Sequence, residues 1–402
     1  MTITSVVLVA VSLLAAGVFF QPRLLGAVNW RATVTPLASI IGSGFLIAGP
    51  ILSLAAGRLA WLAMLGLCAA GYLFGEAIRH NIVHVEPELD DAPSAGVRWI
   101  ERASQLALSL AYFVSVAYYL NLFAAFGLRL GAVTDPFWVR VTATVVIGGV
   151  GVIGLLGGLK ALERLEVGAV GLKLSVIAGL FAALILASLL SLKAGTFAWH
   201  APDHPHGLTE LRILLGLVIL VQGFETSRYL GDAYDAPTRV RTMRWAQLIA
   251  TGIYLVFMLL ITAYFTRQEP AAEATAIIDM LAPLGLALAP MIILAALASQ
   301  LSAAVADTNG AGGLVSESLN RRIPVNIGNA ITAAAAIVIT WTADIYQIVT
   351  WASQVFVAYY ALQSAQAAWS AWRQKRFWRA LLFAGGVLLA VVIVVFAIPA
   401  EV

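Results

Sequence analysis

Two short stretches, Ile41-Gly42-Ser43-Gly44-Phe45 and Gln222-Gly223-Phe224-Glu225, interrupt runs of residues that otherwise have the pattern of continuous apolar helices. Glycine destabilises the interior of a helix, so each stretch predicts a break in the helix that contains it. In lipid, every backbone N–H and C=O group needs a partner within the protein, and unwound backbone is tolerated only where protein buries it or where it lines a cavity. Paired breaks of this kind point to a binding site inside a membrane.

The composition of the whole chain shows that lipid is the relevant solvent. Of its 402 residues, 61% are hydrophobic and 11% are charged, whereas about a quarter of the residues in a typical soluble domain are charged. Apolar runs of the ~20 residues needed to cross a bilayer recur from end to end. We expect one membrane domain, 1–402, with twelve spans: 3–20, 33–55, 59–78, 103–130, 137–158, 165–192, 211–231, 245–266, 284–312, 324–341, 345–371 and 379–398.

The basic residues are distributed unevenly between the two sets of loops. If the loop after the first span is cytoplasmic, the loops on that side hold 16 Lys and Arg residues and the loops on the other side hold 6. By the positive-inside rule this asymmetry orients the protein and predicts that both termini lie outside the cytoplasm. The net positive charge is then explained without a nucleic-acid partner, and we expect a multi-pass protein of the cytoplasmic (inner) membrane.

The first apolar run, 3–20, has two interpretations. It lacks the positively charged start and the small-residue cleavage pattern of a secretory signal peptide. We therefore expect it to be retained as an extra span, with a signal peptide as the alternative. The other eleven spans are numbered from 33–55 onward.

Several polar residues are predicted to lie at the same depth in the membrane as the two breaks. A rise of ~1.5 Å per residue gives the approximate depth of each position along its span. Gly42–Gly44 in span 1 and Gly223–Glu225 in span 6 fall near the middle of a ~30 Å apolar core. Lys173 in span 5 and two serines in span 8, Ser299 and Ser302, fall in the same layer. We expect these residues to share one layer of the membrane.

The residues around the breaks resemble the signatures of the amino acid–polyamine–organocation (APC) superfamily. Ile40–Phe45, followed by Pro50, is similar to the first-span signature of that superfamily, and Gly223–Glu225, followed by the loop Asp235–Arg239, is similar to the elements around its sixth span. Weaker similarities are found at 72–76 in span 2 and at 163–173 in span 5. The resemblance covers roughly residues 33–371; the added first span and the single span after the tenth depart from the pattern.

The resemblance implies an all-α integral membrane fold of five plus five helices. Its two inverted repeats would be 33–192 and 211–371, with one extra N-terminal span at 3–20 and one span after the repeats at 379–398. It further implies a secondary active transporter (a permease) of amino acids or related amines, working by alternating access around broken spans 1 and 6.

The breaks themselves suggest how such a substrate is bound. Free N–H groups after Gly44 suit a carboxylate, and free carbonyl groups before Gly223 suit an ammonium group. The alternative is that the glycines only allow close packing of helices. The expected substrate-binding residues are Gly42, Ser43, Gly44, Gly223, Phe224 and Glu225.

Lys173 and Glu225 are the candidates for carrying a coupled proton. The resemblance implies this role for Lys173, because in some members a lysine in span 5 stands in the place of a sodium ion, and a charged lysine at this depth is costly. The alternatives are that Lys173 extends to the cytoplasmic surface and that Glu225 forms a structural ion pair with Arg228 at i+3. Sodium coupling through the hydroxyl groups of Ser299 and Ser302 is the alternative to proton coupling.

Other classes of function fit the sequence less well. The spans hold too few clustered acids, histidines or nucleophiles for an enzyme, so we expect no catalytic residues and no cofactor. The loop 199–206 contains three histidines and one aspartate that could ligate a metal ion, but its prolines favour a solvated loop and we expect no metal site. The alternatives are a sodium-coupled transporter of another small organic solute, or a non-transporting channel or sensor. The oligomeric state is left open.

Overall fold

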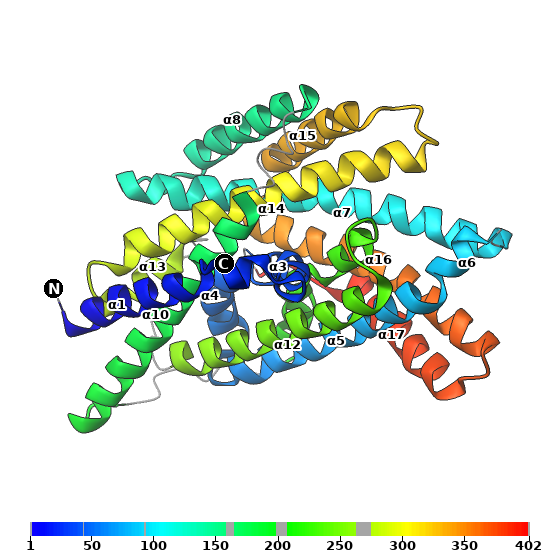
Figure 1. Cartoon of the computed structure of the whole chain (residues 1–402). Helices are drawn as coiled ribbons and strands as arrows, with labels where there is room; N and C mark the ends of the chain where they lie inside the picture. The colour runs from blue at the N-terminus through cyan, green and yellow to red at the C-terminus, as the bar shows by residue number, and fades with distance from the viewer. Residues whose placement is uncertain are drawn as a thin grey trace.

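The computed structural model describes residues 2–42, 44–91, 94–157, 165–197, 207–262 and 275–400, and this part of the chain is helical with no strands (Figure 1). Eight of its helical segments are long and apolar enough to cross a membrane, which supports the prediction of a multi-pass helical membrane protein. They are Val28–His84, Ala95–Gly131, Pro136–Leu155, Gly168–Lys193, Ala236–Ile261, Leu288–Ser318, Val325–Thr342 and Phe377–Phe396.

The remaining predicted spans are also helical but do not meet the same criterion. Val28–His84 contains two predicted spans. The extra span is α1 (Ile3–Phe19), which has 17 residues. Predicted span 10 is α16 (Ile345–Arg373), and predicted span 6 is divided into short pieces.

The first break lies where the sequence predicts it. Helix α3 (Val28–Ile40) ends just before Gly42, and α4 (Gly44–Ala56) begins two residues after it. The backbone N–H of Gly42 donates to the carbonyl of Ser39 at 3.1 Å, which tightens the last turn of α3. The intervening residue, Ser43, lies outside the described residues.

The second break is longer than predicted. Helix α11 (Leu208–Leu215) is followed by two 3₁₀ segments, η3 (Val218–Val221) and η4 (Phe224–Leu230), separated by Gly223 at φ = 115°. A side chain from far along the sequence supplies hydrogen bonds to this unwound backbone: the hydroxyl of Ser353 in α16 accepts from the N–H of Ile219 at 2.9 Å and donates to the carbonyl of Gly216 at 2.7 Å. The break is therefore stabilised by tertiary contacts that spacing along the sequence does not reveal.

The helices pack in two groups. One group surrounds the breaks and contains α3, α4, η3, η4, α5 (Ala60–His84) and α12 (Ala236–Ile261). The other contains α7 (Ala95–Leu128), α8 (Pro136–Leu155), α14 (Leu288–Ser318) and α15 (Val325–Thr342). In Figure 1, α8 and α15 lie side by side above α14 and α7.

Two further helices connect these groups, and each is accompanied by another helix. Helix α10 (Leu165–Lys193) packs on α14, α12 and α3, with α1 along its length. Helix α16 packs on α7, α5 and η3, with α17 (Phe377–Phe396) beside it.

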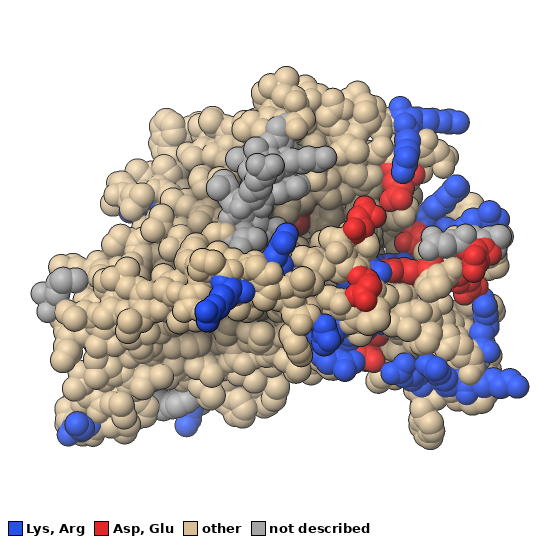
Figure 2. All heavy atoms as spheres, in the orientation of Figure 1, with Lys and Arg blue, Asp and Glu red and all other residues tan. Residues whose placement is uncertain are grey.

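The surface separates a charged end from an apolar middle. Figure 2 shows Lys, Arg, Asp and Glu gathered mainly at the end where α6 (Glu86–Asp90) and the α16–α17 turn lie, and we call this the charged end. Large apolar side chains are exposed on the outer helices, as Val145 of α8 (69%) and Leu388 of α17 (67%) illustrate. Such a surface is suited to contact with lipid.

Candidate functional site

The two breaks contact each other directly. A Cβ atom added to Gly44 would lie 2.6 Å from the carbonyl oxygen of Leu220, and one added to Gly223 would lie 2.7 Å from the carbonyl carbon of Ser39. Neither position can therefore hold a side chain without displacing the backbone of the other break. The glycines predicted from the sequence form one buried unit, because the backbone of each break packs where a side chain of the other would lie.

A tyrosine from α12 joins the two breaks. The hydroxyl of Tyr254 lies 2.9 Å from the carbonyl oxygen of Ile40 at the end of α3 and 2.5 Å from that of Leu220 in η3. Its ring packs on Phe45, with 6.0 Å between the ring centroids, and the side chain is fully buried. Because a hydroxyl carries a single proton, the two carbonyl groups share one donor. Sequence analysis did not single out Tyr254, since a tyrosine in an apolar span has no distinctive pattern.

Glu225 folds back onto the second break. Its Oε2 atom accepts hydrogen bonds from the N–H of Gly223 at 2.9 Å and from the hydroxyl of Tyr360 in α16 at 2.7 Å. The ring of Phe224 stacks on Tyr360, with 5.0 Å between the centroids. The carboxylate is buried and lies at the start of η4, where backbone N–H groups favour negative charge.

The alternative pairing of Glu225 with Arg228 is wrong. The guanidinium of Arg228 donates instead to Glu101 of α7 at 2.8 Å and to Gln363 of α16, and lies 3.8 Å from Glu86. The spacing i+3 suggested a local pair, but Glu225 turns toward Gly223 while Arg228 extends toward α7.

Lys173 points into the protein, so the alternative that it extends to the cytoplasmic surface is also wrong. The side chain is 6% exposed, and its ammonium group donates to the carbonyl of Ala38 at 2.9 Å and to the hydroxyl of Ser299 at 2.9 Å. Lys173 thus connects α10 to the last turn of α3 and to α14. Its positive charge lies at the carbonyl end of α3, where the helix dipole favours it.

Two small cavities adjoin Lys173. One, of about 20 Å³, is lined in part by Gly42 and Phe45, and the other, of about 10 Å³, in part by Ser302. The ammonium group donates to Ser299, whose hydroxyl would be a sodium ligand if the transporter were coupled to sodium. Depth along the spans placed Lys173, Ser299 and the first break in one layer, and the structure shows that they are also in contact.

The sequence analysis overlooked a buried carboxylate. Asp307 of α14 is 7% exposed and accepts a hydrogen bond from the hydroxyl of Ser115 in α7. Nearby, the amide of Gln222 at the second break donates to the hydroxyl of Tyr119 at 3.2 Å. An acid within an apolar span is itself a signal of function, so Asp307 was visible in the sequence.

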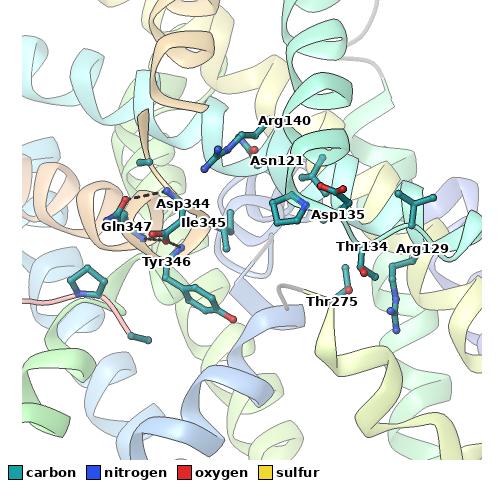
Figure 3. A pocket seen from close by; sticks show the side chains of 17 residues that line it. Asn121, Arg129, Thr134, Asp135, Arg140, Thr275, Asp344, Ile345, Tyr346 and Gln347 are labelled. Atoms are coloured by element: carbon teal, nitrogen blue, oxygen red, sulfur yellow. Dashed lines mark hydrogen bonds between the residues drawn. The ribbon is translucent and has the colours of Figure 1, made fainter. Parts of the chain in front are cut away.

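A hollow of about 750 Å³, which we call the vestibule, lies at the end opposite the charged end. The C-terminal end of α7, the start of α8, the α15–α16 connection and residues 399–400 enclose it (Figure 3). Asn121, which is buried, lies on its wall and donates to Thr340 of α15 at 2.8 Å. Its other polar lining residues include Arg129, Asp135, Arg140 and Asp344.

Ion pairs link the helices at the charged end. Arg239 of α12 bonds Glu86 of α6 at 2.7 Å and the carbonyl of Arg228 at 2.8 Å, while Arg79 and Glu76 pair at 3.0 Å within α5. Arg373 of α16 pairs with Glu88 at 2.6 Å. The structure is therefore hollow at one end and closed by ion pairs at the other.

Comparison with known proteins places this arrangement in a family. A family model described as "APC superfamily transporter" matches residues 22–397. The chain belongs to the APC superfamily. A protein of Aquifex aeolicus (strain VF5), described as an uncharacterized protein, is 38% identical over 351 residues, which cover 86% of this chain and 85% of that protein.

Membership of the APC superfamily confirms the resemblance and extends it. The match includes α17, which the sequence resemblance did not cover, and begins after α1. The transporter therefore has a helix, α1, that lies outside the matched region. The loop 199–206 lies outside the described residues, and among the described residues no group of three or more His, Cys, Asp or Glu could hold a metal ion.

Proposed function

We propose that this transporter carries an amino acid or a related amine across the cytoplasmic membrane in symport with protons, by alternating access around the two breaks. The observation that carries the proposal is the contact between the breaks, with Lys173 at the carbonyl end of one and Glu225 at the N–H end of the other. Buried groups of opposite charge, one at each of two contacting breaks, suit a substrate that has both an amine and a carboxylate. The proposed contacts to substrate come from Gly42, Ser43, Gly44, Gly223, Phe224 and Glu225.

The proposed fold consists of inverted repeats at 33–192 and 211–371. Each helix of the first repeat has a counterpart in the second: α3–α4 corresponds to the α11–η4 region, α5 to α12, α7 to α14, α8 to α15 and α10 to α16. Under this correspondence, counterpart helices make counterpart contacts. Thus α10 packs on α14 and α12 as α16 packs on α7 and α5. An experimental structure without a two-fold relation in the membrane plane between α10 and α16 would contradict this assignment.

Lys173 provides a physical route for coupling. When protonated, it makes charge-assisted hydrogen bonds to α3 in one helix group and to α14 in the other. Loss of the proton removes the charge and weakens both bonds. The protonation state of one side chain would therefore control how firmly the two groups are held together.

Uptake into proteoliposomes driven by a pH gradient tests the coupling. Lys173→Ala should abolish gradient-driven accumulation but preserve exchange of substrate down its own gradient. Lys193→Ala is the matched control, because Lys193 is an exposed lysine at the end of the same helix. Unchanged dependence of Lys173→Ala on the pH gradient would refute proton coupling through this residue, and a requirement for sodium would favour Ser299 and Ser302. If the substrate never accumulates against its own concentration gradient, the result would favour a channel.

The proposed orientation places the charged end in the cytoplasm. The positive-inside rule supports it, because the predicted cytoplasmic loops hold most of the basic residues. A single cysteine at Lys375, which is exposed in the α16–α17 turn, tests the orientation with little background because the native Cys68 is buried. We expect an impermeant thiol reagent to label it only after intact cells are permeabilised. Labelling without permeabilisation would reverse the orientation.

A further inference from the structure

Three arginines from three helices converge on one carboxylate at the charged end. Arg79 of α5 pairs with Glu76, one turn earlier on the same helix, at 3.0 Å. Arg244 of α12 lies 3.8 Å from Glu76, and Arg379 of α17 lies 3.5 Å from the other oxygen of that carboxylate. Helices α12 and α17 both pack on α5, so these two arginines reach Glu76 from different neighbours of that helix. We call the four residues the arginine cluster.

The arginine cluster has an excess of positive charge. One carboxylate serves three guanidinium groups, and no other carboxylate among the described residues forms an ion pair with them. The remaining hydrogen bonds of Arg79 go to neutral groups, the side chain of Gln247 and the carbonyl of Tyr72. Figure 2 shows Lys and Arg gathered along the edge of the charged end where α12, α5 and α17 lie in Figure 1. A buried charge is costly unless an opposite charge matches it, so an anion is favoured here.

An anion can reach the arginine cluster from the surface. The side chains of Arg244 and Arg379 are 48% and 46% exposed, whereas Arg79 is only 2% exposed. The distances from the two exposed arginines to Glu76 exceed the ~2.7–3.2 Å of an N–H···O hydrogen bond, so their guanidinium groups retain donors. A guanidinium group presents these donors as a planar fork that matches the oxygens of a phosphate.

The surroundings of the arginine cluster are those of the boundary between lipid headgroups and lipid tails. Each exposed arginine is next in sequence to an exposed tryptophan, Trp245 on α12 and Trp378 on α17. Exposed tryptophans are typical of the membrane–water interface. About one turn farther from the charged end, Leu248 and Leu382 are exposed on the same two helices, where lipid tails would contact them.

We propose that the arginine cluster binds the phosphate of an anionic phospholipid. Arg244 and Arg379 approach the same carboxylate, so one phosphate placed beside Glu76 contacts both of them. The acyl chains of the lipid lie along the exposed apolar side chains of α12 and α17. Basic pockets between membrane-spanning helices recognise lipid headgroups through the same combination of charge and position.

The bound lipid has a structural consequence. Helix α12 belongs to the group that surrounds the breaks, and α17 accompanies α16, which connects the two groups. A phosphate between Arg244 and Arg379 therefore joins these two helices across α5. This inference concerns the bilayer and does not depend on which substrate the transporter carries.

Native mass spectrometry of the purified, delipidated full-length protein tests the inference. Titrations with phosphatidylglycerol and with phosphatidylcholine of matched acyl chains give the apparent affinity for the first bound lipid. The two lipids share a phosphate, but phosphatidylcholine neutralises it with its own ammonium group. We expect phosphatidylglycerol to bind about thirtyfold more tightly, which corresponds to the two positive charges in excess.

The double variant Arg244→Ala/Arg379→Ala should reduce the preference for phosphatidylglycerol to less than about threefold. Arg322→Ala is the matched control, because Arg322 is an exposed arginine in the connection between α14 and α15, and it should keep the preference. If the double variant does not fold, each single variant should weaken binding of phosphatidylglycerol about fivefold. Glu76→Gln should have the opposite effect and strengthen binding, because it removes the carboxylate that competes with the phosphate.

Four results would overturn the inference. Equal affinities of the wild type for the two lipids would show that the excess charge does not attract a lipid. A preference that survives in the double variant would place the lipid site elsewhere on the molecule. Displacement of phosphatidylglycerol by an equal concentration of inorganic phosphate would make the arginine cluster a site for a soluble anion. Weaker binding by Glu76→Gln would show that the carboxylate does not compete with a phosphate, which contradicts the charge argument.

Discussion

The two breaks differ in where their charged residue comes from. At the first break, Lys173 reaches in from α10 and bonds both α3 and α14. At the second, Glu225 belongs to the break itself and bonds the N–H of Gly223. A change of charge at Lys173 therefore alters contacts between helices, whereas a change at Glu225 alters the local geometry of one break. We therefore expect substitution of Lys173 to change how the two helix groups are held together, and substitution of Glu225 to change the second break alone.

The largest effect is expected from a change that separates the breaks. Gly44→Leu would place side-chain atoms against the backbone of Leu220, so the breaks must move apart. We expect no detectable substrate binding by titration, from a protein that still inserts and elutes as a single species. Gly66→Leu in α5 is the control, because nothing lies within 4 Å of a Cβ atom at Gly66. Normal binding by a well-folded Gly44→Leu protein would exclude the breaks as the site.

A smaller effect is expected at Glu225, and it sharpens the contrast with Lys173. Glu225→Gln retains an oxygen that can accept from Gly223 and Tyr360, so the protein should fold and bind substrate with reduced affinity. It should lose the pH dependence of transport, measured as uptake across a series of external pH values. Adding Arg228→Ala should not restore it, because Arg228 pairs with Glu101. Recovery in the double variant would show that the two residues act as a pair.

The ion pair between Glu101 and Arg228 is expected to stabilise the fold rather than to act in transport. Glu101→Gln would leave the buried guanidinium of Arg228 without its closest carboxylate. Breaking a buried ion pair in this way costs about 3–5 kcal/mol. We therefore expect Glu101→Gln to lower the free energy of unfolding more than Glu225→Gln does, as measured by denaturation in mixed micelles. The opposite order would mean that the carboxylate of Glu225 is the structural one.

The smallest effect is expected from Tyr254→Phe. The variant keeps the ring but removes the donor that Ile40 and Leu220 share, at a cost of about 1–3 kcal/mol for unsatisfied buried carbonyl groups. The melting temperature should fall by a few degrees, and transport should slow without loss of substrate selectivity. Tyr234→Phe, in a partly exposed loop, should change neither. An unchanged melting temperature in Tyr254→Phe would mean that other donors satisfy the two carbonyl groups.

The sequence was sufficient for those features that depend on local pattern and helix rise. Apolar runs predicted the helices, the glycines marked the first break, and depth along each span placed Lys173 and Ser299 in the same layer. Features that depend on distant partners were missed. The length of the second break depends on Ser353 of α16, and the true partner of Arg228 is Glu101 of α7. Asp307 was missed for a different reason: attention went to the serines of the same span, although an acid there is the more costly residue.

The hydroxyl of Tyr254, which the two breaks share, has a consequence for the leakage of protons across the membrane. Each break presents its glycine to the backbone of the other, and one proton serves the carbonyl groups of both. We therefore expect that loosening of the first break disturbs the second, so that the two breaks move together. We expect this coupling to suppress states that are open on both sides, through which protons would dissipate their gradient without carrying cargo. Faster substrate-free proton flux in Tyr254→Phe proteoliposomes than in the wild type would reveal it, and equal flux would show that the seal lies elsewhere.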